Sequence, residues 1–546
     1  MAGRKPKTRL YACGALTLLC LVGVVVWIAL SLRRKCPQGS FFKAAIAADS
    51  EKCSQVGRDM LQRGGSAVDG AIAALLCTSV VNPQSMGLGG GAIFTVMNSS
   101  GDVQIISSRE TVPKLFKPDL LKSCPKKFRF MSGPEWIGVP GEIRGYELAH
   151  RLYGKLPWAT LFQPTIKLAR EGLQISPLLE KYIPVINKSL SVYKLFSDAN
   201  GKPLTTGDII KFEKLADTLE VIANYGANAF YSGTIAKDLI SDIQEAGGTL
   251  TLQDLASFRA SQSDAWVFPF QDFEVYIPPP PAGGALLALL LNIMKGYKSD
   301  ANEKTLAYHR YIEAFKFVNG LRKYIHDPNI TPDKITKSFI QDRFADHIRT
   351  LISDRTHGEK YYNLTSYLDS MGTTHMSVLA EDGSAVSVTS TINHLFGSQI
   401  LSPKTGIILN NQISDFCGRT EIHAGEQPPS SVSPAVLKSQ SRMLLIGASG
   451  GSFITTGIAS TLMNHLFFGK SLKEAIESPV VFVNSVNQPQ FEEKFDQKII
   501  DGLIAFGHKY DPKKMVFFNV VNAVEKDGDC ICAVSDARKM GKAAGY

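Results

Sequence analysis

The sequence of 546 residues lacks several features that would assign it to a common class of protein. No linker divides it, no Lys/Arg stripe is interleaved with aromatic residues, and no two histidines have the His-x-x-x-His spacing of a metal site. Much of the formal charge of +9 belongs to the first 35 residues, so this charge does not indicate a nucleic-acid-binding protein. A hydrophobic content of 44% with 20% charged residues predicts instead a globular protein with a large core.

Charge is also absent from the stretch Tyr11 to Leu32, which is largely apolar. A helix needs about 20 such residues to cross a bilayer. The stretch shows neither the shorter apolar region nor the small-residue cleavage site of a removed signal peptide. We therefore expect a cytoplasmic tail at residues 1–10 and an uncleaved transmembrane signal-anchor at residues 11–32.

Basic residues flank this stretch on both sides and do not orient it in the membrane. Asn-x-Ser/Thr sequons orient it better, because all of them follow the apolar stretch and none precedes it. This arrangement predicts a single-pass type II protein of the plasma membrane, with its body outside the cell. The predicted glycosylation sites are Asn98, Asn187, Asn329 and Asn363.

Two helices are predicted at the start of the body, at residues 50–63 and 66–77, with a Gly-Gly turn between them. Helices joined by a tight turn lie antiparallel, which brings Cys53, early in the first, near Cys77, late in the second. We expect a disulfide between them; the alternative is two buried free thiols.

The glycine-rich segment from Asn82 to Gly91 superficially resembles a phosphate-binding loop. No Lys followed by Ser or Thr comes after it, and it leads into a strand pattern at residues 92–97 rather than a helix. We therefore expect the glycines to allow close backbone packing, without a nucleotide.

Arg109-Glu110 follows the strand-like residues 103–106. A guanidinium at that place can bind a substrate carboxylate through two parallel hydrogen bonds, although by itself the pair is more simply a surface ion pair. Further along, the proline-rich segment 278–284 precedes a helix pattern at 285–294. It is interpreted as structural punctuation, with the lining of a cleft as the alternative.

An Asp-Gly pair at residues 382–383, between two alternating β-branched runs, predicts a β-hairpin with a two-residue turn. Its register places Thr373 opposite Ile392. Thr391 and Asn393 flank that position, so two polar side chains converge on the threonine hydroxyl. By itself the pattern also fits an ordinary hairpin with surface Ser and Thr.

A threonine hydroxyl is a poor nucleophile unless a base removes its proton. A threonine at the start of a chain carries such a base in its own α-amine, with a reference pKa of about 8. This chemistry requires cleavage of the Gly372–Thr373 bond, which the hydroxyl begins by attacking the preceding carbonyl. Gly372 offers little steric resistance to that attack.

The segment Gly447 to Gly451 lies between a strand pattern at 443–446 and a helix pattern from Ile454. Backbone N–H groups in such a turn suit a tetrahedral oxyanion, although glycine-rich turns are common.

Together these segments resemble the γ-glutamyltransferase family, over nearly all of the chain after the apolar stretch. Residues 82–86 and the sequence as a whole are most similar to the branch of this family that hydrolyses leukotriene C4. The resemblance implies an α+β fold, the four-layer αββα sandwich of N-terminal-nucleophile hydrolases, preceded by one transmembrane helix. The matching segments are residues 82–91, Arg109-Glu110, residues 372–393, Asn410-Asn411, Ser430-Ser431, residues 447–451 and the terminal residues 543–546.

The resemblance also implies a precursor that cleaves itself into a large subunit, residues 37–372, and a small catalytic subunit, residues 373–546. The two remain together as a heterodimer. Thr373 then attacks the γ-glutamyl amide of glutathione or its S-conjugates, such as leukotriene C4. Water, or an acceptor amino acid or peptide, resolves the acyl-enzyme. No metal, organic cofactor or nucleic acid is implied.

The family's residue roles carry over to the matching positions. Thr391 hydrogen-bonds the nucleophile's hydroxyl, and the amides of Gly450 and Gly451 form the oxyanion hole. Two sets of side chains bind the ends of the γ-glutamyl group: Arg109, Ser430 and Ser431 for the α-carboxylate, and Asn393, Gln412 and Asp415 for the α-amino group.

One position departs from the family pattern, because residue 412 is Gln where many animal relatives have Glu. This lowers the charge complementarity to the substrate amine. The polar segment from Phe416 to Pro429 is expected to cover the pocket. Three alternatives remain: a hydrolase with little transfer activity, a catalytically inactive single-chain ectodomain that acts as a binding protein, and a receptor ectodomain. The intact nucleophile and glycine turn argue against the inactive form.

Overall fold

The computed structural model describes residues 36–546 except 127–128, 298–302, 333–334, 365–371 and 511–519. The predicted tail at 1–10 and signal-anchor at 11–32 lie outside these residues and stay predictions. Within the described part of the chain, no helix has the length and hydropathy of a membrane span. The chain divides into a short unit, Met1–Ser40, and a compact unit, Phe41–Tyr546, which holds the helices and strands.

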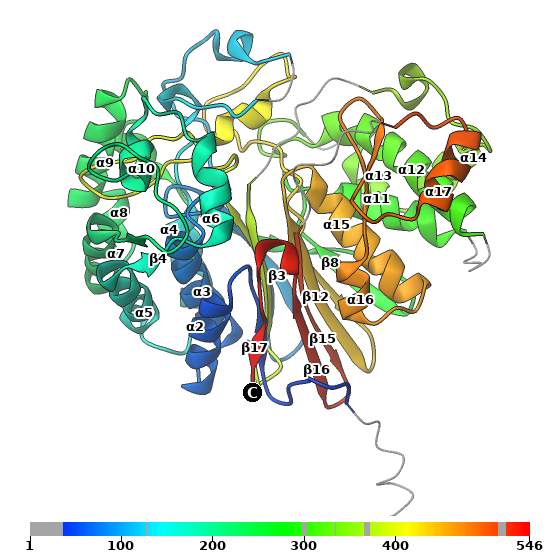
Figure 1. The fold of residues 1–546 in the computed structure, drawn as a ribbon, viewed down its shortest axis with the longest axis horizontal. Helices are drawn as coiled ribbons and strands as arrows, with labels where there is room; N and C mark the ends of the chain where they lie inside the picture. Colours follow the sequence, from blue (N-terminus) through cyan, green and yellow to red (C-terminus); the bar gives the residue numbers. More distant parts are fainter. Residues whose placement is uncertain (1–35, 127–128, 298–302, 333–334, 365–371, 511–519) are drawn as a thin grey trace, which may run out of the picture. The chain divides into compact units, whose positions relative to one another are not determined.

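Two antiparallel sheets form the centre of the compact unit (Figure 1). The seven-stranded sheet has the order β17 (Ala544–Gly545), β1 (Ala45–Ala47), β9 (Thr374–Leu379), β10 (Ala385–Thr391), β2 (Gly91–Met97), β3 (Val103–Ser107), β6 (Ser261–Asp264). The six-stranded sheet has the order β16 (Cys530–Ser535), β15 (Val520–Asp527), β12 (Arg442–Ser449), β11 (Ala435–Lys438), β8 (Phe273–Ile277), β7 (Trp266–Phe270).

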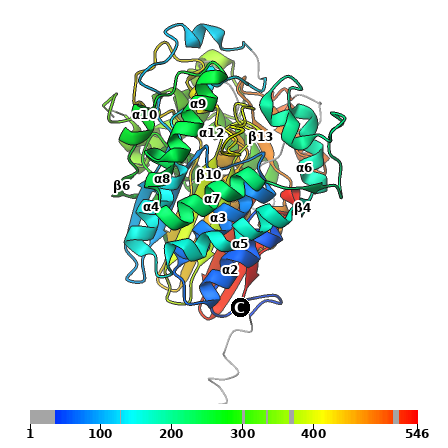
Figure 2. The ribbon, with the colours of Figure 1, turned by 90° about the vertical axis from the view of Figure 1, so that its left-hand side faces the viewer.

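Helices cover the outer face of each sheet, as Figures 1 and 2 show. On the seven-stranded sheet lie α2 (Glu51–Gln62), α3 (Ala67–Val81), α4 (Glu142–Tyr153) and α5 (Trp158–Glu171), with α6 (Pro177–Tyr182), α7 (Glu213–Tyr225), α8 (Asn228–Tyr231), α9 (Thr234–Glu245) and α10 (Leu252–Ser257) on the same side. The helices on the outer side of the six-stranded sheet are α11 (Gly284–Lys295), α12 (Lys304–Leu321), α13 (Thr336–Phe339), α14 (Asp342–Leu351), α15 (Phe453–Leu462), α16 (Leu472–Glu477) and α17 (Gln497–Ala505). The layers follow the order helix, sheet, sheet, helix, in agreement with the αββα prediction.

Side chains along β9 alternate between the two interfaces of their sheet. Met376 and Val378 pack with the helices, whereas His375 and Ser377 face the second sheet. The Ser377 hydroxyl donates to the carbonyl of Asn522 in β15, at 3.1 Å. Because buried polar groups need partners, such hydrogen bonds fix the position of one sheet on the other.

The β9–β10 hairpin forms as predicted, but its register is shifted by one residue. Ser390 pairs with Thr374, and the loop comprises the three residues 381–383. Gly383 closes it in the left-handed region, with φ 82°, and its N–H donates to the Ala380 carbonyl. Three-residue loops of this kind compete with two-residue turns when glycine occupies the last position. The predicted pairing of Thr373 with Ile392 is therefore wrong, and Thr373 lies beside Thr391.

The two predicted helices at the start of the body are confirmed as α2 and α3. Ser66 caps α3 and forms a reciprocal capping box with Asp69. The predicted disulfide is present between Cys53 and Cys77.

Gly89, Gly90 and Gly91 pack closely against backbone, as predicted for this segment, whereas Gly87 has open space beside it. A Cβ atom at Gly90 would lie 2.1 Å from the Thr391 carbonyl oxygen, and one at Gly89 would lie 2.2 Å from that of Ile408. Neither position has room for a side chain, so the backbone of this segment packs directly against the end of β10 at Thr391.

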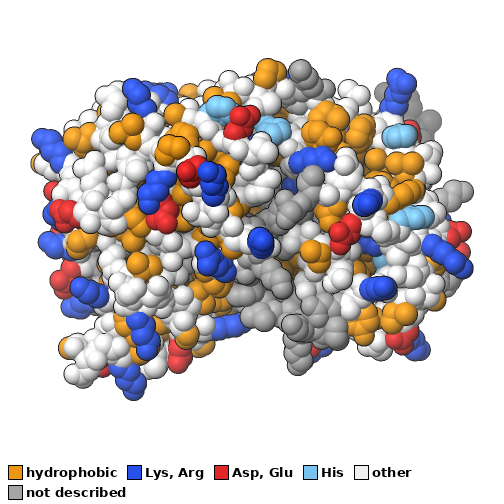
Figure 3. Space-filling view, turned by 90° about the horizontal axis from the view of Figure 1, so that it is seen from above, with side chains coloured by type: hydrophobic (Ala, Val, Ile, Leu, Met, Phe, Trp, Pro, Cys, Tyr) orange, Lys and Arg blue, Asp and Glu red, His pale blue; other side chains and the backbone are white. Residues whose placement is uncertain are grey.

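The sequon asparagines lie at the surface, with Asn187, Asn329 and Asn363 exposed and Asn98 partly exposed. Their glycosylation remains a prediction. In the view from above, Lys and Arg side chains are dispersed among acidic and hydrophobic ones rather than gathered in one stripe on the described part of this face (Figure 3).

Glu142 of α4 makes the stability of the fold dependent on pH. Its carboxylate is fully buried and accepts hydrogen bonds from Tyr146 and Ser390, at 2.6 and 2.8 Å. Burial raises its pKa from 4.5 to about 8. The folded state thus binds this proton more tightly than the unfolded chain does. The contribution of this proton to the free energy of unfolding is fully present below pH 4.5 and is lost as the pH rises through about 8.

We expect Glu142→Gln to remove this dependence. Relative to wild type, the variant should gain stability between pH 5 and pH 9, by up to about 4 kcal/mol in the free energy of unfolding. Urea unfolding of both proteins at the two pH values measures the difference. Glu147→Gln, on the exposed side of the same helix, is the matched control. A difference between Glu142→Gln and wild type that is the same at both pH values would contradict the assignment.

Candidate active site

A cavity of about 130 Å³ opens at the end of β10 where Thr391 lies. Nine of the residues predicted to act in the site line it, although they come from distant parts of the sequence: Arg109, Thr373, Thr391, Asn393, Gln412, Asp415, Ser430, Ser431 and Gly451. Gly372 and Gly450, the other two, are hydrogen-bonded to each other and adjoin lining residues.

Thr373 lies immediately before β9, and its side chain is buried in the cavity wall. Its hydroxyl donates to the Thr391 hydroxyl at 3.0 Å, and the same Thr391 oxygen accepts the N–H of Asn393 at 2.8 Å. The N–H of Thr373 donates to the Ser85 carbonyl at 3.1 Å. The residue has φ 80°, an unfavourable conformation for a β-branched side chain. These contacts hold the hydroxyl in one position.

The carbonyl before the nucleophile meets the predicted oxyanion turn. The N–H of Gly450 donates to the Gly372 carbonyl at 3.0 Å, just before α15 begins. Gly450 and Gly451 have φ values of 114° and 61°, which favour glycine. At Gly372 a Cβ atom would lie 1.9 Å from the Asn393 carbonyl oxygen, so only glycine fits. This geometry puts a donor on the carbonyl that Thr373 would attack.

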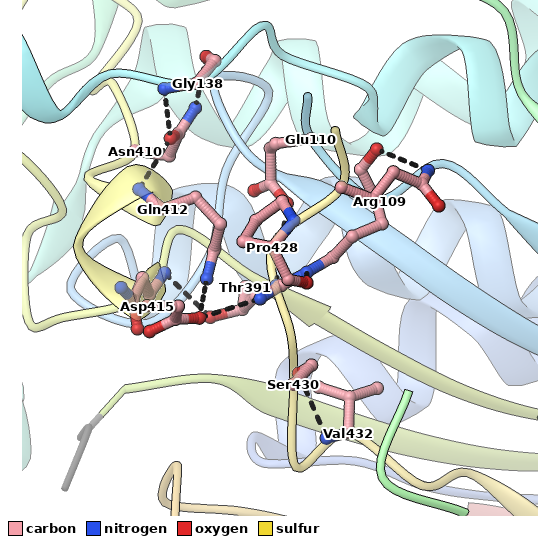
Figure 4. A network of polar contacts seen from close by, with 12 residues as sticks. Arg109, Glu110, Gly138, Thr391, Asn410, Gln412, Asp415, Pro428, Ser430 and Val432 are labelled. Atoms are coloured by element: carbon pink, nitrogen blue, oxygen red, sulfur yellow. Dashed lines mark hydrogen bonds and ion pairs between the residues drawn. The ribbon is translucent and has the colours of Figure 1, made fainter. Parts of the chain in front are cut away.

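Arg109 and Glu110 are buried, with exposed side-chain fractions of 2% and 0%, which overturns the interpretation as a surface ion pair. Nη2 of Arg109 contacts Oδ2 of Asp415 at 2.7 Å and also donates to the Pro429 carbonyl. Nε donates to the Pro428 carbonyl at 3.2 Å. Figure 4 shows Arg109 and Asp415 directed toward one another.

The two carboxyl groups beside Arg109 are held in a poorly solvated place. Burial raises the pKa of Glu110 to about 7, although the Arg109 charge opposes the rise. Burial also raises the pKa of Asp415, with Arg109 and the Gln412 amide acting in the opposite direction. Burial therefore weakens the negative charge of both carboxyl groups beside the Arg109 cation.

Gln412, in the short helix η7 (Gln412–Phe416), contacts Asp415 directly. Its Nε2 donates to Oδ2 of Asp415 at 2.6 Å. Its Oε1 is buried and has no hydrogen-bond partner among the described residues. A buried acceptor of this kind in a cavity wall is suited to a ligand N–H.

Ser430 and Ser431 lie across the cavity, after the segment that was expected to cover it. The Ser430 hydroxyl accepts the N–H of Val432 at 3.1 Å, and that of Ser431 accepts from the Arg322 guanidinium. The covering segment, residues 416–429, contributes several cavity-lining residues: Cys417, Gly418, Arg419 and Pro429.

A second disulfide, Cys124–Cys417, anchors this segment and was not predicted. The two cysteines are 293 residues apart, and no local pattern pairs them. The bond ties the wall of the cavity to the loop that follows β3.

A lysine that sequence reasoning missed lies beside the nucleophile. Lys539, in η9 (Ala537–Lys539), donates to the Thr373 carbonyl at 2.6 Å. It follows no recognisable spacing, and its contact with Thr373 spans 166 residues.

The described residues also contain a group with the composition of a metal site: His309, Glu313 and His508. Lys316 occupies the place of a cation there, since its Nζ lies 3.1 Å from Oε1 of Glu313 and 3.2 Å from Nδ1 of His508. The two imidazoles bond each other at 2.8 Å. The group is thus closed by its own hydrogen bonds, and we assign no metal to it.

Comparison with known proteins identifies relatives of the chain. Residues 53–546 match the family described as Gamma-glutamyltranspeptidase. The chain is 44% identical to glutathione hydrolase 5 proenzyme of Mus musculus, over 96% of this chain and 97% of that protein. It is 42% identical to the protein of the same name from Rattus norvegicus, over 98% of this chain and all of that protein.

Solved structures share the fold. A cephalosporin acylase from Bacillus halodurans superposes with a TM-score of 0.83, covering 94% of this chain and 97% of that one, at 24% identity. A chain of the Helicobacter pylori gamma-glutamyltranspeptidase superposes with a TM-score of 0.51, over 57% of this chain and 92% of that one, at 26% identity. The match over nearly the whole length, on a fold and a cavity of this kind, shows that the chain belongs to the gamma-glutamyltranspeptidase family of enzymes.

Proposed function

We propose that the protein is a self-cleaving glutathione hydrolase that works through a Thr373 acyl-enzyme. The proposal rests on two hydrogen bonds at one cavity, one to each side of the Gly372–Thr373 peptide bond. The Thr373 hydroxyl is oriented by Thr391, and the Gly372 carbonyl accepts the Gly450 N–H. A nucleophile and an oxyanion donor thus flank the same peptide bond.

Self-cleavage begins when Oγ1 of Thr373 attacks the carbonyl carbon of Gly372. The carbonyl oxygen gains negative charge, which the Gly450 N–H stabilises. The C–N bond then breaks as the hydroxyl proton passes to the departing nitrogen, which leaves Gly372 as an ester on Oγ1 and gives Thr373 a free α-amine. Water hydrolyses the ester, releases the Gly372 carboxylate and restores the hydroxyl. The cut separates the chain up to Gly372, whose residues 37–372 are the large subunit, from the small subunit 373–546, and the two stay together as a heterodimer.

The new α-amine then serves as the base. It takes the hydroxyl proton as Oγ1 attacks the γ-glutamyl amide carbon, and it passes the proton to the leaving amine. The departure of the Gly372 carboxylate frees the Gly450 N–H, which stabilises the oxyanion of the substrate in turn. Water, or an acceptor amino acid or peptide, releases the γ-glutamyl group from Oγ1.

The ends of the γ-glutamyl group match the charges of the cavity. Arg109 binds the α-carboxylate with Ser430 and Ser431, and Asp415 binds the α-amino group with Asn393 and Gln412. In the free site Arg109 and Asp415 neutralise each other at 2.7 Å. When the zwitterionic end of the substrate binds, its carboxylate pairs with Arg109 and its ammonium pairs with Asp415, so no charge is left unpaired. Oε1 of Gln412 supplies a neutral acceptor for the ammonium.

Three further cations line the same cavity: Arg322, Lys323 and Arg419. Glutathione and its S-conjugates carry a second carboxylate on the glycine side, and these cations favour its entry by electrostatic attraction. The relatives named glutathione hydrolase 5 proenzyme support glutathione as the substrate. We include S-conjugates such as leukotriene C4 in the proposal, together with an extracellular, membrane-anchored location and glycosylation at the sequons.

The test is to purify the body of the protein, sequence the N-terminus of every fragment and assay glutamate release from glutathione. A fragment that begins Thr373-Thr374-His375, together with glutamate release, supports the proposal. A folded single chain that releases no glutamate would instead favour an inactive ectodomain that acts as a binding protein.

A further inference from the structure

The ammonium of Lys539 occupies a buried place beside the nucleophile. Its side chain is 10% exposed. Nζ donates to three oxygen atoms: the Thr373 carbonyl at 2.6 Å, Oγ of Ser449 at 2.9 Å and Oδ2 of Asp49 at 2.8 Å. The hydrolysis steps described above do not use this group.

These acceptors belong to three separate segments that meet at the site. Thr373 precedes β9, and Ser449 ends β12 immediately before Gly450, the oxyanion donor. Asp49 lies between β1 and α2. One ammonium therefore connects the nucleophile to the turn that stabilises its oxyanion.

Asp49 fixes the lysine from behind. Its Oδ2 also accepts the Thr374 hydroxyl at 2.7 Å, and its Oδ1 accepts Nδ2 of Asn522 at the same distance. Nδ2 of Asn522 donates in addition to the His375 carbonyl. The lysine is thus held in one position by a network that includes the first residues of β9.

We propose that Lys539 is a positioning residue that clamps the Thr373 carbonyl and keeps the α-amine of the cleaved enzyme neutral. A protonated amine on Thr373 would place a second positive charge close to the fixed ammonium, in a region where water screens little. The neutral amine is the form that accepts the hydroxyl proton. This inference rests on the proposed function, since the amine exists only after cleavage.

Other titratable groups surround the amine. His375 remains neutral because burial lowers its pKa to about 3. Asp49 opposes Lys539, but it reaches the chain at Thr374 rather than at Thr373. Asp536 and Arg538, next to Lys539 along the chain, form an ion pair with each other. Arg109 lines the cavity, and the other charged groups of the site line it as well or contact Arg109: Glu110, Asp415, Arg322, Lys323 and Arg419. Substitutions at Lys539 leave all of them in place.

The test compares pH profiles of kcat/KM for glutathione hydrolysis. At low pH kcat/KM falls as the α-amine of Thr373 becomes protonated, and this fall is the acidic limb of the profile. In Lys539→Met the acidic limb should move to higher pH by about one unit, because the amine gains a proton more readily. Lys539→Arg keeps the charge and should keep the limb of the wild type. Lys542→Met is the matched control, since this exposed lysine pairs only at the surface, with Glu51.

Asp49→Asn provides a change of opposite sign. Without the Asp49 carboxylate, the Lys539 ammonium disfavours protonation of the α-amine more strongly, and the acidic limb should move to lower pH. If Lys539→Met remains uncut, restoration of cutting in Lys539→Arg together with the downward shift in Asp49→Asn supports the inference. A wild-type limb in Lys539→Met, or an unmoved limb in Asp49→Asn, overturns it. Failure of the wild type itself to cut or to release glutamate refutes the proposed function instead.

Discussion

Thr373→Ala is expected to leave the chain as one uncut polypeptide and to abolish glutamate release from glutathione. The substitution removes Oγ1, which is both the attacking atom of self-cleavage and the acceptor of the γ-glutamyl group. Loss of a catalytic nucleophile lowers kcat by about ten-thousand-fold or more. The hydroxyl makes one hydrogen bond, to Thr391, so folding should be retained. A denaturing gel and an assay of free glutamate measure the two effects.

Two further variants separate chemistry from folding. Thr373→Ser keeps a hydroxyl and an α-amine, so it should be cut and should retain activity at a reduced rate. Thr78→Ala removes a buried threonine hydroxyl whose partner among the described residues is the Ala74 carbonyl of the same helix, and it should behave as wild type. Cutting of Thr373→Ala at the same bond would show that the hydroxyl does not begin the cleavage.

The parts of the fold that could be predicted from the sequence are those set by local patterns. A Gly-Gly turn separates α2 from α3, a Ser66 cap begins α3, and the antiparallel arrangement of the two helices brings Cys53 to Cys77. The alternation of β9 and β10 indicates a hairpin. Its register was wrong by one residue, because an Asp-Gly pair fits both two-residue and three-residue loops. That small difference decides whether Thr391 or Ile392 faces the nucleophile.

The contacts that complete the site could not be derived from local patterns, because they join distant segments. Arg109 and Asp415 are 306 residues apart, and Cys124 and Cys417 are 293 apart. The family resemblance placed Arg109 and Asp415 in one pocket, but not in contact with each other. It also assigned Gln412 to the substrate amine, an assignment that stays a prediction, and the Gln412 amide nitrogen contacts Asp415 within η7. The Arg109–Asp415 and Cys124–Cys417 pairs form only when folding brings their distant segments together.

Arg109→Lys is expected to raise the KM for glutathione strongly while leaving kcat much less affected. Lysine keeps the positive charge that Asp415 and Glu110 require, but it loses the planar pair of donors that fits a carboxylate. A lost charge-assisted contact costs about 2–4 kcal/mol, which corresponds to roughly 30-fold to 1000-fold in binding. Arg109→Met should have a larger effect, because it also leaves Asp415 without its partner.

The substrate itself supplies the decisive comparison for Arg109. An analogue of glutathione whose γ-glutamyl α-carboxylate is replaced by hydrogen offers nothing for this guanidinium to bind. Wild type and Arg109→Lys should therefore hydrolyse the analogue with similar KM values, although they differ widely on glutathione. Arg144→Met, which removes a largely buried guanidinium stacked on Tyr231, controls for a general loss of charge. Equal penalties on both substrates would move the carboxylate to another residue, and Arg322 or Arg419 would be the next to test, since both line the same cavity.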